Sequence, residues 1–149
     1  MTDRTEREVL HDLIEICKDG ERGYRAAAAH VSDAELKTLF GELANERKRF
    51  ADELTPHLHR LGGVPDDGSN AAALHRGWMT LKGLVPGSHN HKLIAEAERG
   101  EHYALNAYEE ALNGMLPPTA IPIVEAQREA IGRANERIRT YDMGYAVSE

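Results

Sequence analysis

Glutamate and histidine are plentiful in this chain, which has 25 acidic residues and 8 histidines among its 149 residues. A two-metal centre in a helical bundle takes a Glu from each of two helices and a Glu-x-x-His pair from each of the other two, because residues three apart share a helix face. One such pair occurs, Glu8 with His11, and both residues are expected on a solvated face. Glu53 and His57 are four apart and lie on either side of Pro56, which makes them poor ligands for a shared ion. The sequence therefore predicts no metal site of this form.

Other residue combinations that support catalysis are also missing. The sequence has no glycine-rich phosphate loop and no Ser-His-Asp order. Two His-x-His pairs, His57 with His59 and His89 with His91, place their members in different directions on a helix, so we expect them in solvent. Cys17 is the only cysteine and lies on an apolar face, which predicts a small buried hydrophobe and not a nucleophile. We therefore predict no catalytic residue.

An arginine within an apolar stripe is the feature most suggestive of a site. A long helix is predicted from Ser32 to Gly63 because its apolar residues recur at threes and fours. The stripe consists of Leu36, Leu39, Phe40, Leu43, Phe50, Leu54, Leu58 and Leu61. At roughly 100° per residue, Arg47 projects within about 20° of the centre of this stripe. Such an arginine needs a buried acidic partner on another helix, or it must extend to water.

Three other polar side chains are predicted to point inward at a similar level. Glu21 lies about 60° from the centre of the stripe on the first helix. Glu101 lies near the centre of its own stripe, and Gln127 lies on the stripe of the last helix. At about 1.5 Å per residue, these three residues and Arg47 fall within about two turns of the midplane of a bundle about 40 Å long. We predict that the four form a buried polar cluster, in which the arginine supplies the positive charge that a metal would otherwise provide.

Two alternatives stay open for the same residues. In the first, Arg47 bends its guanidinium to the surface and Glu21 sits at a helix boundary. In the second, the inward carboxylates hold iron, and the ligands are drawn from Glu21, Glu98, Glu101 and Glu125. The cluster without a metal is the preferred prediction, so no cofactor is expected.

The helices that would position these residues follow from the apolar pattern. They are predicted at Thr5 to Val31, Ser32 to Gly63, Ala71 to Leu84, Asn90 to Asn113 and Thr119 to Tyr141, with a loose tail over 142–149. Thr5 with Glu8, and Ser32 with Glu35, fit capping boxes. Tight turns make the first two and the last two long helices antiparallel, whereas a middle connection of roughly thirty residues makes the second and third long helices parallel. The expectation is a single all-α domain over residues 1–149, a ferritin-like four-helix bundle with a long crossover that carries a short helix.

Five stretches of sequence support this architecture. They are LHDLIEICKDGERGYRAAA, ERKRFADEL followed by RLGG, GSNAAALHRGWMTLKGLV, AEAERGEHYAL, and LPP with the Gln127 helix. Over nearly the whole chain, they resemble an uncharacterised bacterial family of ferritin-like four-helix-bundle proteins, a domain of unknown function. The resemblance implies a ferritin-like bundle whose crossover helix is anchored through His75, Arg76 and Trp78. Some relatives have a histidine at the position of Asn135, and this departure weakens an inherited metal role for the last helix.

Charge and hydropathy limit the classes of function. The net charge of −7 leaves no basic patch for nucleic acid and disfavours an anionic membrane surface. The chain has no apolar signal core and no run of membrane-spanning length, so cytoplasmic residence is expected. Our leading hypothesis is a non-catalytic, stress-associated interaction module that forms a homodimer or binds another protein. The alternatives are an iron-binding or iron-oxidising protein, and a small-ligand binder beneath the crossover helix, which a gap lined by Tyr24, Tyr103 or Tyr108 would favour.

Overall fold

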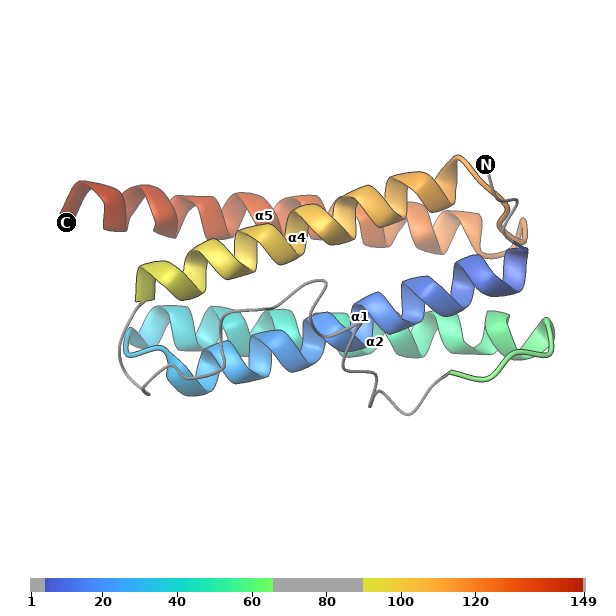
Figure 1. Ribbon diagram of the computed structural model, residues 1–149, viewed down its shortest axis with the longest axis horizontal. Helices are drawn as coiled ribbons and strands as arrows, with labels where there is room; N and C mark the ends of the chain where they lie inside the picture. The colour runs from blue at the N-terminus through green and yellow to red at the C-terminus, as the bar shows by residue number, and fades with distance from the viewer. Residues whose placement is uncertain (1–4, 66–89, 149) are drawn as a thin grey trace.

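Four long helices make up the described part of this computed structural model, which covers residues 5–65 and 90–148 (Figure 1). They are α1 (Glu6–His30), α2 (Ala34–Arg60), α4 (Asn90–Leu112) and α5 (Ile121–Ser148). Within these residues there is no strand, so the protein is an all-α four-helix bundle, as predicted. None of the helices in the described ranges is apolar over a stretch long enough to cross a membrane.

Capping residues explain where the first two helices begin. The Thr5 hydroxyl accepts a hydrogen bond from the Glu8 N–H at 3.1 Å, and the Glu8 carboxylate accepts one from the Thr5 N–H at 3.3 Å, which confirms the predicted capping box. For α2, the prediction of Ser32 as the cap is wrong by one residue. Asp33 is the N-cap, and its carboxylate accepts from the Leu36 N–H at 2.9 Å. Serine and aspartate cap equally well, so the sequence pattern did not distinguish two adjacent candidates.

Two glycines end α2 as predicted. The Gly63 N–H donates to the Leu58 carbonyl and the Gly62 N–H donates to the His59 carbonyl, both at 3.0 Å. Gly62 has φ +80°, a conformation that glycine adopts without steric cost. Pro56 lies inside this helix, which nevertheless continues to Arg60.

α5 differs from the prediction at both ends. It begins at Ile121 and not beside Thr119, whose hydroxyl lies 3.4 Å from Nδ1 of His57. It also continues to Ser148, so its predicted end at Tyr141 is wrong. The apolar period of the sequence ends at Tyr141, so the pattern predicts no packing face beyond it. The helix continues because its backbone hydrogen bonds need no packing face and no proline interrupts them.

The helices are arranged so that every packed pair is antiparallel. The pairs in contact are α1 with α2, α2 with α5, α5 with α4, and α4 with α1. In Figure 1, α2 and α4 run in the same direction, which confirms the predicted parallel pair, and they lie on a diagonal of the bundle.

Hydrogen bonds at both ends fix this direction. Asn90, the first residue of α4, accepts from the Ser32 N–H at 3.0 Å beside the α1–α2 turn. At the other end, Thr119 of the α4–α5 connection contacts His57 near the end of α2. The arrangement is compatible with the ferritin-like prediction. The predicted crossover helix, with His75, Arg76 and Trp78, lies outside the described residues.

Two apolar clusters fill the interior and are separated near the middle of the bundle. One is built from the buried apolar residues within 9–17, 50–58, 104–111 and 120–131. The other is built from the buried apolar residues within 24–31, 36–44 and 93–97, with Ala134 and Ile138. The buried charged residues Arg47 and Glu101 lie between the two clusters, and they form the candidate site together with polar side chains at the facing edges of both clusters.

Candidate functional site

A buried ion pair crosses the centre of the bundle. Arg47 of α2 and Glu101 of α4 are bonded through Nη2 and Oε1, and their side chains are only 4% and 1% exposed. Because α2 and α4 lie on a diagonal, this pair spans the bundle axis. Removing two charges from water costs several kcal/mol each, and the cost is offset only where the geometry and the remaining hydrogen bonds are good.

Tyr24 of α1 completes this charged group. Its hydroxyl donates to the same Glu101 oxygen that Arg47 contacts, and its ring centroid lies 5.9 Å from the Arg47 Cζ. The carboxylate is therefore held from two helices, and the guanidinium is also placed against an aromatic ring. The second oxygen, Oε2, is buried and accepts no hydrogen bond within the described part of the chain. We call Tyr24, Arg47 and Glu101 the central triad.

Gly20 makes the space that the triad occupies. A Cβ atom placed on Gly20 would lie 3.1 Å from the Arg47 Cζ and closer still to its Nη1. Glycine in the middle of a helix costs about 1 kcal/mol relative to alanine. The close approach of a charged side chain from α2 accounts for its presence on the packing face of α1.

A second polar group lies beside the triad. Cys17 and Tyr108 meet with Sγ and the hydroxyl oxygen 3.0 Å apart, and the Tyr108 hydroxyl donates to Gln127 Oε1 at 2.7 Å. Gln127 Nε2 donates to Glu53 Oε1 at 2.9 Å and to the Phe50 carbonyl at 3.3 Å. We call this the relay, because it connects the buried thiol through four helices to a carboxylate at the surface.

The triad and the relay repeat at the same interval on two helices. On α1 the interval separates Cys17 from Tyr24, and on α4 it separates Glu101 from Tyr108, seven residues in each case. Seven residues are about two turns, or roughly 10 Å along a helix, and return to the same face. The core therefore carries two polar layers. The central triad is charged, and the relay is uncharged at its buried end, where Cys17 meets Tyr108.

Burial and the ion pair together set the protonation of these side chains. Burial is the largest single influence on the pKa of Arg47 and lowers it, but the Glu101 carboxylate and the smaller effects of Tyr24, Cys17 and Tyr108 together outweigh burial, so the pKa is raised. Burial and then the Glu101 charge raise the pKa of Tyr24 well above its usual value. Burial also raises the pKa of Tyr108 well above its usual value and that of the Cys17 thiol to about 11. At neutral pH the two phenols and the thiol are therefore uncharged hydrogen-bonding groups.

Of the four residues predicted for a single cluster, the structure brings Arg47 and Glu101 together. Gln127 is buried as expected but belongs to the relay. Glu21 does not join, and its placement in the cluster is corrected here. It is partly exposed and pairs with Arg25 of the same helix at 2.8 Å. Its offset from the centre of the α1 stripe is large enough for a long side chain to turn toward water.

The tyrosines are the site residues that the sequence analysis missed. Tyr24 and Tyr108 were considered as possible lining of a ligand gap, and not as members of the polar cluster. A buried tyrosine hydroxyl usually finds a polar partner, so two tyrosines on inward faces were a signal that polar layers exist. Glu53 was considered only with His57, but it contacts Gln127. The prediction that His57 lies in solvent is wrong, because it is buried beside Thr119 and Arg60.

The side chains that the structure describes over 5–65 and 90–142 do not fit a two-metal centre. Among the described residues, no three His, Cys, Asp or Glu side chains come close enough to hold a metal ion. Glu125 is exposed. Glu98 lies beside Asp142, and burial with this neighbouring carboxyl raises the pKa of Glu98. Asn135 is buried, and its side chain is a neutral amide that supplies no charge to a metal ion.

Comparison with known proteins agrees with the sequence resemblance. Among curated proteins, no significant match to this chain is found. A family model described as "Domain of unknown function (DUF2383)" matches residues 5–114, which include α1, α2, α4 and the whole central triad. The match covers more than half of the chain, and the chain belongs to this family of unknown function.

Proposed function

We propose that this protein is a non-catalytic, ferritin-like interaction module whose central position is filled by an internal ion pair in place of a two-metal centre. The observation that carries the proposal is the Arg47–Glu101 pair across the bundle axis. Ligands for two metal ions would have to converge from all four helices at this level. Here the inward carboxylate is bonded to a permanent cation.

Electrostatics support this reading. Two divalent ions need several carboxylates to offset their charge, and Arg47 cannot release its proton to make room for a metal. A metal ion bound to Glu101 would face the guanidinium in a setting where charges are weakly screened. The ion pair therefore opposes metal binding at the position where the fold would otherwise favour it.

Interaction with a second copy of the chain is the simplest role for such a module. Within the described residues, the exposed large hydrophobic side chains are Val64, Tyr103, Met115 and Ile121. Val64, Met115 and Ile121 all belong to the end of the bundle where α2 and α4 finish and α5 begins. We propose that this end contacts the partner. Sedimentation of the wild type and of Met115→Lys tests the interface, and a monomeric wild type would contradict it.

Iron oxidation tests the non-catalytic part of the proposal. Fe(II) is added to the protein without oxygen, air is admitted, and the ferric absorbance is followed. We expect oxidation no faster than in the same buffer with a control protein of equal net charge. Rapid oxidation that is lost in Glu101→Ala would overturn the proposal in favour of an oxidase.

A further inference from the structure

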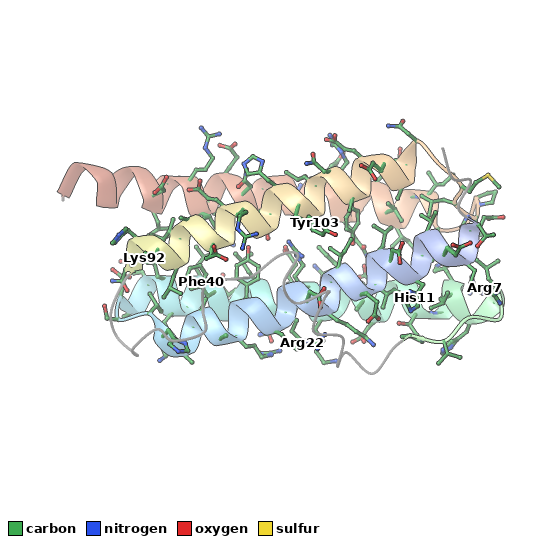
Figure 2. All side chains as sticks on the ribbon, viewed as in Figure 1. Arg7, His11, Arg22, Phe40, Lys92 and Tyr103 are labelled. Carbon is green, nitrogen blue, oxygen red and sulfur yellow. The ribbon has the colours of Figure 1, made fainter. Side chains whose placement is uncertain are left out.

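A groove lies between α1 and α4, away from the central triad. Its volume is about 420 Å³. The residues that line it are Asp12, Leu13, Ile16, Tyr103, Asn106, Ala107, Glu110 and Ala111. Tyr103 lies on α4 on the side that faces α1 (Figure 2). This surface is distinct from the interface proposed at the end of the bundle, and the inference made from it does not depend on that proposal.

The floor and the rim of the groove differ in chemistry. Leu13 and Ile16 are buried in the floor, and Ala107 is half-buried beside them. The rim carries the exposed side chains of Tyr103 and Glu110, among others. No arginine or lysine belongs to the described lining, so the charged groups that face the groove are carboxylates.

The dimensions suit a small molecule. Ligand sites usually have volumes of about 300–1,000 Å³, and the volume of this groove lies in that range. Along α4 the lining runs from Tyr103 to Ala111, which is roughly 12 Å at 1.5 Å per residue. An aromatic ring with a short charged arm would fill this length.

We propose that this groove binds a small organic cation with an apolar body. The apolar body packs on Leu13, Ile16 and Ala107, and the cationic group pairs with the Glu110 carboxylate. The exposed ring of Tyr103 offers a face on which a cation is also stabilised. Charge complementarity selects the sign, because a net charge of −7 and an acidic rim repel anions.

The test compares three probes of one shape: phenethylammonium, phenethyl alcohol and phenylacetate. Each is titrated into the ¹⁵N-labelled full chain, and amide shifts are followed by NMR. We expect saturable shifts along 103–111 for the cation, with affinity at least about fivefold above that of the alcohol, and no saturation for phenylacetate. Because the rim is exposed to solvent, added salt should weaken binding of the cation and leave the alcohol unchanged.

Variants locate the site. Glu110→Gln should reduce the affinity for phenethylammonium toward that of the alcohol, with the Asp12 carboxylate still in the lining, and Ala107→Leu should abolish binding of both by filling the floor. Glu125→Gln removes the same charge from the exposed face of α5 and should have no effect. Glu110 is exposed, so its variant is expected to fold, which its unchanged NMR spectrum would verify. Equal binding of cation and alcohol, absence of saturation with the cation, or equal effects of the Glu110 and Glu125 variants would overturn the proposal.

Discussion

The replacement Glu101→Ala tests the energetic role of the central triad. It removes the carboxylate that neutralises Arg47 in the core, and with it one hydrogen bond of the Tyr24 hydroxyl. Removing one member of a buried pair typically costs about 3–5 kcal/mol, because the remaining charge is uncompensated. At a urea m-value of about 2 kcal/mol/M, the unfolding midpoint should fall by roughly 2 M.

A combined variant separates the cost of breaking the pair from the value of having it. Tyr24→Phe, Arg47→Met and Glu101→Leu together remove every charged or hydroxyl group of the triad and retain most of its volume. Replacing a whole buried ionic group by apolar residues is often neutral or stabilising. The triple variant should therefore unfold within about 1 kcal/mol of the wild type, or above it.

The matched control is Glu21→Ala. Glu21 also forms an ion pair with an arginine, but this pair with Arg25 is partly exposed and lies within one helix. Exposed pairs four residues apart contribute about 0.3–0.5 kcal/mol, so the midpoint should shift by only roughly 0.2 M. A triple variant less stable than Glu101→Ala, or a Glu21→Ala loss equal to that of Glu101→Ala, would refute the reasoning. Equal m-values across the series verify that the same unfolding reaction is measured.

Three further predictions concern other residues of the bundle. Gly20→Ala should lower the free energy of unfolding by about 1–3 kcal/mol, because the added Cβ meets the Arg47 side chain, whereas Gly132→Ala, which meets nothing within 4 Å, should raise it by up to about 1 kcal/mol in the same urea titration. Burial and Arg60 lower the pKa of His57 below its usual 6.5, so its contribution to stability is present above that pH and is lost as the pH falls through it. The free energy of unfolding should therefore change less between about pH 7 and pH 5 in His57→Gln than in the wild type. Native Cys17 should react with iodoacetamide at least about 100-fold more slowly than in urea, since it is buried and its pKa is about 11, and fast native labelling would contradict its placement.

The sequence was sufficient to predict helix ends where the signals are local. The Thr5–Glu8 capping box and the pair of glycines after α2 specify helix ends through contacts within a few residues. The length of the connection was sufficient to predict the relative direction of α2 and α4, since a long connection permits a parallel pair that a short turn forbids. The end of α5 was missed, because a helix can continue beyond its packing face.

The site was predictable in part for the same physical reason. Arg47 and Glu101 lie at the centres of their stripes, so their direction and height on the helices were sufficient to bring them together. Glu21 lies away from the centre of its stripe, where a long side chain can reach either the core or the solvent. Periodicity alone therefore did not predict its orientation. The relay from Cys17 through Tyr108 depends on which hydroxyl meets which acceptor, and only the packed helices determine that contact.

The metal content of the purified protein tests the central claim most directly. The full chain is produced in cells grown with added iron, purified without chelators, and analysed for iron, manganese and zinc per chain. Because Arg47 holds the inward carboxylate of Glu101, we expect well below one metal ion per chain and no change in Glu101→Ala. Two ions per chain that persist through gel filtration and disappear in Glu101→Ala would contradict the account and show that the bundle opens its ion pair to bind metal.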